Sequence, residues 1–319
     1  MKPLQLILVA LFAIGVALLV AGISSRLLRR IANGYVRWTL LILASFVTLV
    51  PFFWLVCAAF KDPSVMNAYT FLPAPWDWGN PTEDGSKSIV NFGNFTKLFA
   101  DRSSFNGTLH FWIFIGNSLF LAGITTVLSL LFCSLAGFVL AKYDFRGKTT
   151  LILFMLGTLM VPGMLFLAPG YRLMNSLGWL DTYWALIIPA SCSTFGIFLF
   201  RQAIVSVPSE LIEAARIDGA SDFRIWWQVV MPLVKPMTGA YCLISFLGSW
   251  NNYLGPQIYI SSEEKLTLPV ILNQFVGFYT NEYGVFLAGT LIAILPPAIL
   301  FLALQREFVA GLTSGAVKG

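Results

Sequence analysis

Residues 111–140 read FWIFIGNSLFLAGITTVLSLLFCSLAGFVL and contain no Asp, Glu, Lys, Arg or His. At 1.5 Å per residue such a helix is about 45 Å long, which exceeds the ~30 Å hydrocarbon core of a bilayer. Apolar runs long enough to cross a bilayer also occur at residues 4–23, 38–60, 149–168, 183–204, 237–259 and 284–304. The sequence therefore predicts an all-α, polytopic helical membrane protein.

The composition supports this class. Of the 319 residues, 57% are hydrophobic and 11% are charged, and the mean hydropathy is +0.78. Soluble domains carry about 25% charged residues, and disordered chains combine low hydrophobicity with high net charge. A soluble enzyme and a disordered chain are therefore excluded. A membrane β-barrel is excluded as well, because its strands would show alternating segments of about ten residues.

Cysteine and histidine usage argues against a cofactor site in this chain. All four cysteines lie inside apolar runs and none forms a C-x-x-C pair, so they read as buried hydrophobes. His110 is the single histidine, which excludes a zinc or haem site built from histidines. The net charge of +5 does not indicate nucleic acid, because positive charge is expected on the cytoplasmic loops of a membrane protein.

Lysine and arginine positions set the expected orientation. Placing residues 24–37 in the cytoplasm puts thirteen Lys and Arg on that side and seven on the other. The positive-inside rule then predicts a cytoplasmic C-terminus and an external N-terminus.

The run at 4–23 could instead be a cleaved signal peptide, because it ends in small residues. We favour a retained helix, since cleavage would leave Arg26, Arg29 and Arg30 outside. The expected organisation is an extra span with a basic cytoplasmic loop at 1–37 and a transmembrane domain at 38–319.

The central parts of the predicted spans lack ionisable residues, which proton-coupled carriers need inside the bilayer. If the protein moves a solute, another polypeptide is expected to supply the energy. Gly147, Lys148 and Thr149 look like the end of a phosphate-binding loop, but such a loop needs glycine at position 142, which is Lys142. A basic turn between two spans explains them better.

The segment 206–223 reads SVPSELIEAARIDGASDF and predicts a helix, a turn and a second helix. Ser206 suits the N-cap of the first helix and Pro208 its first turn. Leu211, Ala214 and Ala215 are spaced to share one helical face. The small alanines would let this helix lie deep in a groove on a partner, although a solvated loop helix has the same composition.

The turn and the second helix have equally clear signals. Gly219 is a natural left-handed end to the first helix. Ser221 and Asp222 can open the second helix, which would end near Pro232.

The spacing of this segment resembles a family signature. Glu213-Ala214-Ala215, three residues, Gly219, nine residues and Val229-Val230-Met231-Pro232 resemble the EAA signature of binding-protein-dependent ABC importer permeases. Val229 and Met231 depart from the usual Ile and Leu, and both changes keep an apolar side chain. Other matching stretches include 141–148, 160–162, 177–182, 249–252, 267–269 and the C-terminal 305–319. The chain is similar to MalG-type permeases of carbohydrate importers over about residues 38–319.

The resemblance implies a fold, partners and a location. The fold would be the six-span core of a type I importer, with the run at 4–23 as an extra span. A second related permease, two cytoplasmic ATPase subunits that bind ATP and Mg, and an extracytoplasmic solute-binding protein would complete the transporter. The chain would then be a transporter subunit, not an enzyme, in the cytoplasmic membrane of a bacterium or archaeon. A permease for a non-sugar solute and a non-transport membrane scaffold or channel are the alternatives.

The resemblance also carries roles to particular residues. The loop at about 205–232 would hold the coupling helix that seats in the ATPase, with contacts from Glu213, Ala214, Ala215, Arg216, Asp218 and Gly219. The C-terminal tail, with Gly315 and Lys318, would reach the same partner. Outside, the polar loop Ser261, Ser262, Glu263, Glu264 and Lys265 would contact the binding protein. Amide and aromatic side chains suit sugars, which makes the substrate-path candidates Asn117, Trp250, Asn251, Asn252 and Tyr253.

Overall fold

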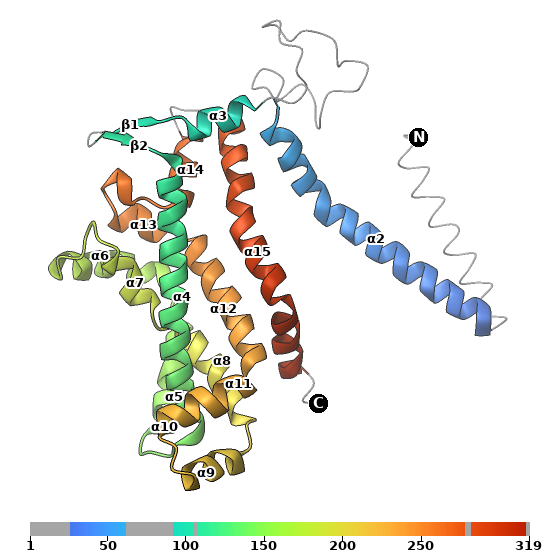
Figure 1. The fold of residues 1–319 in the computed structure, drawn as a ribbon, viewed down its shortest axis with the longest axis vertical. Helices are drawn as coiled ribbons and strands as arrows, with labels where there is room; N and C mark the ends of the chain where they lie inside the picture. Colours follow the sequence, from blue (N-terminus) through green and yellow to red (C-terminus); the bar gives the residue numbers. More distant parts are fainter. Residues whose placement is uncertain (1–25, 62–91, 105–106, 278–281, 317–319) are drawn as a thin grey trace, which may run out of the picture. The chain divides into compact units, whose positions relative to one another are not determined.

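The computed structural model describes residues 26–61, 92–104, 107–277 and 282–316. These residues are mostly helical, which confirms the predicted class. One short antiparallel pair of strands, β1 (Arg102–Ser104) and β2 (Gly107–Leu109), directly precedes the long helix α4 (Phe111–Lys142) (Figure 1). The chain forms two compact units, residues 1–91 and 92–319, and each is described by itself.

The described part of the first unit is one helix, α2 (Arg26–Ala59). The segment predicted as a cytoplasmic loop at 24–37 is helical from Arg26 onward, and its cytoplasmic location stays a prediction. Its residues are mostly strong helix formers such as Leu and Arg, so the helix continues through them. The run at 4–23 lies outside the described residues, and the division at residue 37 stays a prediction.

In the second unit, α4 (Phe111–Lys142) is the central helix. Helices α8 (Thr194–Val205) and α12 (Lys235–Trp250) pack against it, and α15 (Tyr283–Ala316) packs against α12 and the short α3 (Gly93–Phe99) (Figure 1). A buried hydrophobic cluster joins α4, α8 and α12 at one end, with contributions from Phe138, Phe200, Ile204, Trp226 and Tyr241.

Two predicted spans are interrupted. The run at 149–168 is wrong as one helix, because α5 (Lys148–Thr158) is followed by η3 (Gly163–Phe166) and α6 (Leu167–Ser176) after a 92° bend. Pro162 explains the break, since proline lacks an amide donor and disfavours helix in the residue before it. The run at 183–204 divides into α7 (Trp184–Ala190) and α8, whose N-cap Ser193 accepts a bond from the amide of Gly196 at 3.4 Å.

The last two spans differ from prediction in length. The run at 237–259 is too long, because α12 ends at Trp250 and α13 (Leu254–Tyr259) is separate. The Asn252 side chain instead supports the start of α13 by accepting a bond from the amide of Gly255 at 3.1 Å. The helix α15 continues past 304 to Ala316 despite Pro296 and Pro297 inside it.

Short elements connect these helices: α9 (Ser209–Ile217), α10 (Asp222–Ile225), the π-helix η4 (Trp226–Val230), α11 (Met231–Leu233), η5 (Glu263–Lys265) and α14 (Leu268–Gln274). Four helices of the described residues are long and apolar enough to cross a membrane. Counting each of two bent pairs as one span raises the number to six.

The contact between α4 and α8 requires glycine at position 137. A Cβ there would lie 2.7 Å from Cβ of Phe200 and 2.9 Å from the backbone nitrogen of Arg201. Gly137→Val should therefore overpack the interface and lower the thermal unfolding midpoint in detergent by roughly 2 to 10 °C. Gly116→Val on the same helix is the matched control, because no atom lies within 4 Å of its Cβ position. An equal midpoint for both variants would contradict this packing.

Candidate functional sites

The signature segment folds as predicted around its glycine. The helix α9 ends at Ile217, and Gly219 has a φ of +80°, the left-handed conformation expected at this stop. The predicted Ser206 cap is wrong: its hydroxyl donates to the carbonyl of Ala203 at 2.6 Å, and Pro208 occupies the N-cap. Proline fixes φ near the helical value, which explains why the helix begins directly after it.

The helix α9 packs on the rest of the unit through one side only. Ile212 is 4% exposed and, with Ala215, packs on the buried cluster of α4, α8 and α12. Leu211 and Ala214 are exposed, whereas Ala215 is half-buried, so two of the three residues predicted to share a face stay open to solvent in this chain. Ile217 is 87% exposed. The side of α9 opposite Ile212, with Glu213, Ala214 and Ile217, is thus an uncovered surface of mixed character in this chain.

Arg216 ties this segment to the end of α4. Its guanidinium donates to the Tyr143 hydroxyl at 2.9 Å and to the Asp222 carboxylate at 3.3 Å, and it lies 5.2 Å from the Tyr143 ring centre. The Tyr143 hydroxyl and then Arg216 lower the pKa of Asp222. Tyr143 was not among the predicted site residues, because only the fold brings position 143 to position 216.

The segment continues without a gap into α12. Ser221 caps α10, as predicted, by accepting a bond from the amide of Arg224 at 3.4 Å. Trp226 in the π-helix η4 is 1% exposed and belongs to the buried cluster. The chain then bends by 88° between Leu233 and Lys235 into α12. A displacement of α9 can therefore be transmitted to α12 through these packed residues.

At the other end of the unit, Asp181 holds the predicted polar loop. Its carboxylate accepts bonds from the amides of Ser261 and Ser262 at 3.0 and 2.8 Å and from Nζ of Lys265 at 3.0 Å. Its own amide donates to the carbonyl of Tyr259 at 2.8 Å. Asp181 has a φ of +57°, an unusual value for a residue other than glycine. The loop is therefore anchored by a residue that sequence reasoning did not select.

The charge state of Asp181 follows from these contacts. Burial alone would raise its pKa, but the bonds from Ser262, Lys265 and Ser261 together hold that pKa well below its usual range. A depressed pKa means that the anchor is at full strength above the unfolded value near 3.9 and is lost as the pH falls through the folded value. The loop should thus stay anchored throughout the neutral and mildly acidic range.

Asp181→Asn should release the loop, because the asparagine side chain carries no negative charge to pair with Lys265. It also has one acceptor oxygen, where the carboxylate has two. We expect faster hydrogen exchange at the amides of Ser261 and Ser262 at neutral pH. The wild-type chain should keep both amides protected at about pH 4 and below, because the folded pKa of Asp181 lies well under its usual value. Glu263→Gln in the same loop removes an exposed charge and should change neither amide. Unaltered exchange in Asp181→Asn would contradict the anchor.

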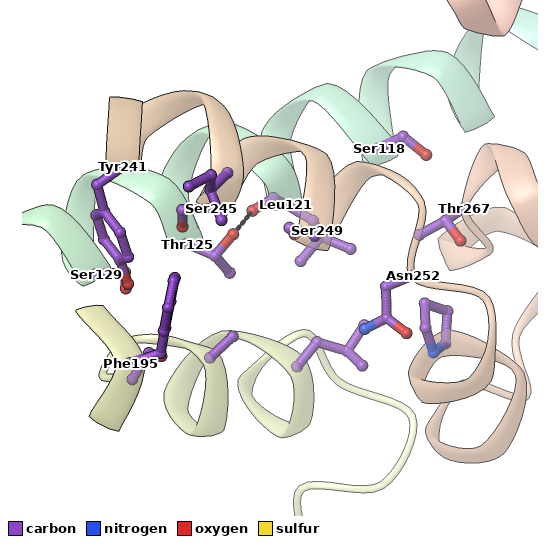
Figure 2. A pocket seen from close by; sticks show the side chains of 16 residues that line it. Ser118, Leu121, Thr125, Ser129, Phe195, Tyr241, Ser245, Ser249, Asn252 and Thr267 are labelled. Atoms are coloured by element: carbon purple, nitrogen blue, oxygen red, sulfur yellow. Dashed lines mark hydrogen bonds between the residues drawn. The ribbon is translucent and has the colours of Figure 1, made fainter. Parts of the chain in front are cut away.

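A cavity of about 250 Å³ lies inside the second unit, between α4, α7, α8 and α12 (Figure 2). None of the sixteen described residues that line it is charged. Eight of them carry hydroxyl groups: Ser118, Thr125, Ser129, Ser193, Tyr241, Ser245, Ser249 and Thr267. Tyr241 and Ser129 meet at 2.7 Å at one end, and Asn252 and Thr267 lie towards the other (Figure 2).

Most predicted substrate-path residues have other contacts. The Asn117 amide donates to the carbonyls of Glu264 and Leu266 at 2.8 and 2.9 Å, so it supports the polar loop. Trp250 is 3% exposed and donates to the carbonyl of Ala293 at 3.1 Å. The Tyr253 hydroxyl accepts a bond from Asn273 at 2.9 Å. Asn251 is exposed and does not line the cavity, so only Asn252 of the five does.

The sequence does contain a signal for this cavity. Ser118, Thr125 and Ser129 recur at helical spacing in α4, and Tyr241, Ser245 and Ser249 recur every four residues in α12. Such stripes place polar groups on one face of an otherwise apolar helix. Of the C-terminal candidates, Gly315 is in the last turn of α15 and Lys318 lies outside the described residues.

Comparison with known proteins gives consistent matches. Residues 133–312 match the family model described as "Binding-protein-dependent transport system inner membrane component". The chain is 35% identical to the arabinooligosaccharides transport system permease protein AraQ of Halalkalibacterium halodurans, over 86% of this chain and 93% of that protein. It is 33% identical to the lactose transport system permease protein LacG of Rhizobium radiobacter, over 91% of this chain and 98% of that protein.

Its fold is similar to that of a chain in the crystal structure of a bacterial ABC transporter that imports the acidic polysaccharide alginate. The TM-score is 0.70 at 24% identity, with 86% of this chain and 96% of that chain covered.

Proposed function

This chain belongs to the family of binding-protein-dependent transport system inner membrane components, and from that membership we propose its partners, orientation and coupling route. The resemblance to carbohydrate-importer permeases is confirmed. The chain is a membrane-embedded permease subunit of an ABC importer for a sugar or oligosaccharide, and it forms part of the translocation pathway.

The uncovered side of α9 is the observation that carries the coupling proposal. Ile212 anchors the helix to the core, which leaves Glu213, Ala214 and Ile217 for a partner. We propose that this side seats in a cleft of a cytoplasmic ATPase, which would bind ATP and Mg. A helix with small side chains on one side suits such a groove. Closure of two ATPase subunits would then move α9 and, through the buried Trp226, α12.

On the outer side, the loop held by Asp181 faces the binding protein in this proposal. Its anchoring by Asp181 and Asn117 presents Glu263, which is exposed, from a fixed base. A second related permease would complete the pathway. The C-terminus would lie in the cytoplasm, where Gly315 and Lys318 would add to the ATPase contact. The membrane is the cytoplasmic membrane of a bacterium or archaeon.

Reconstitution of the purified complex into vesicles tests this function. With its ATPase, second permease and binding protein, the wild-type chain should support ATP-dependent uptake of lactose or an arabinooligosaccharide. Uptake assays with amino acids and small peptides distinguish the sugar importer from the alternative, a permease for a non-sugar solute. Purification of the chain without a bound ATPase, or uptake of the sugar in the absence of ATP, would contradict the importer assignment.

A further inference from the structure

The hydroxyl-lined cavity has the chemistry of a ligand site. Thr267 is 4% exposed, lines the cavity, and its Oγ1 has no hydrogen-bond partner among the described residues. A buried hydroxyl without a partner is costly, and a ligand that donates or accepts there would remove that cost. Thr125 adds a second polar atom. Its hydroxyl donates to the carbonyl of Leu121 at 2.6 Å, and its oxygen can still accept a hydrogen bond from a ligand.

The size of the cavity limits the ligand. About 250 Å³ equals the liquid volume of roughly eight water molecules at ~30 Å³ each. Pockets for drug-sized ligands are larger, at roughly 300–1,000 Å³. One sugar ring therefore suits the space better than a whole oligosaccharide. The bonded pair Ser129 and Tyr241 lies at one end of the cavity (Figure 2).

The lining also selects the charge and shape of the ligand. An anionic ring would lose its hydration without meeting a cation, because none of the sixteen lining residues is charged. A neutral polyol can exchange its water contacts for hydroxyl and amide groups such as Ser249 and Asn252. Phe195 adds an aromatic side chain at the same cavity, and it can cover the apolar face of a ring (Figure 2).

We propose that this chain itself binds one neutral sugar ring in the cavity between α4, α7, α8 and α12, with Thr125 and Thr267 as polar contacts. The proposal rests on the sugar-import function and deepens it. It assigns a sugar subsite to this subunit, and it predicts that rings with a carboxylate are rejected.

Site-directed labelling of the full reconstituted complex tests the site independently of transport. In a Cys192→Ala background, which removes the exposed cysteine, Gly248→Cys places a thiol in the cavity lining. Arabinose, galactose or glucose should slow its reaction with a maleimide, whereas galacturonate and glucuronate should not. Gly116→Cys, an exposed position of α4 outside the lining, should show no sugar effect.

Two adjacent threonines of α4 provide a matched pair of variants. Thr125 and Thr126 are both buried and both donate to the carbonyl four residues earlier at 2.6 Å, but only Thr125 lines the cavity. Thr125→Val and Thr267→Val should raise the sugar concentration for half-protection roughly threefold to tenfold, the effect of losing a neutral hydrogen bond. Thr126→Val should leave it unchanged.

The outcomes separate this proposal from the importer function. ATP-driven sugar uptake without any sugar protection of Gly248→Cys would overturn the subsite and leave the function intact. Protection by the acidic sugars equal to that by the neutral ones would overturn the neutral class. Equal shifts in Thr125→Val and Thr126→Val would show that the cavity does not contact the ring. Sugar protection in a complex that imports no sugar would instead contradict the importer function.

Discussion

Replacing Ile217 by aspartate is expected to abolish ATP-driven uptake while leaving the chain folded. Ile217 is 87% exposed, so the substitution removes almost no intramolecular packing, and surface changes of this kind usually alter stability by less than about 0.5 kcal/mol. In the assembled transporter the same position would lie against the ATPase, where a buried unpaired carboxylate is strongly unfavourable. The measurements are co-purification of the ATPase and uptake into vesicles.

Ile217→Leu is the control for this variant, because it keeps the apolar area and the exposure. It should retain both association and uptake. A thermal unfolding midpoint equal to that of the wild type would show that the Ile217→Asp chain is intact. Normal ATPase association and uptake in Ile217→Asp would refute the assignment of α9 as the coupling surface.

Filling the cavity should stop transport just as completely. Gly248 lines the cavity, and no atom lies within 4 Å of its Cβ position, so Gly248→Leu adds four side-chain atoms to open space. Leucine is also the better helix former, so α12 should not be weakened. We expect ATP-driven sugar uptake to fall below detection while the thermal unfolding midpoint is unchanged or higher.

Gly116→Leu provides the comparison, since it makes the same change on α4 outside the lining and also meets no atom within 4 Å. It should transport normally. Uptake by Gly248→Leu at the level of Gly116→Leu would show that the solute does not pass the cavity.

The membrane class and the signature turn could be predicted because each depends on local sequence. Apolar runs specify helices directly, and the left-handed φ of Gly219 needs only a residue that tolerates it. The bend near Pro162 had a visible signal, but its angle depends on what the following helix packs against. The prediction of Ser206 as the N-cap was wrong because Pro208, two residues later, is the N-cap of α9.

The candidate site was harder to predict because it depends on which side of each helix is buried. Trp250 and Asn117 have the right chemistry for sugars, yet their side chains bond to backbone carbonyls elsewhere in the unit. Asp181 gained its role from contacts eighty residues away in sequence, with Ser261 and Ser262. Only the serine and threonine stripes of α4 and α12 could have indicated the cavity beforehand.

The uncharged lining of the cavity has an electrical consequence. Moving one elementary charge through a membrane potential changes its energy by about 2.3 kcal/mol per 100 mV. A neutral ring that passes side chains without charge carries no current, so voltage neither drives nor opposes its entry. The accumulation that this subunit supports would then be limited by nucleotide hydrolysis and the solute gradient alone, in an energised cell and in a depolarised one alike.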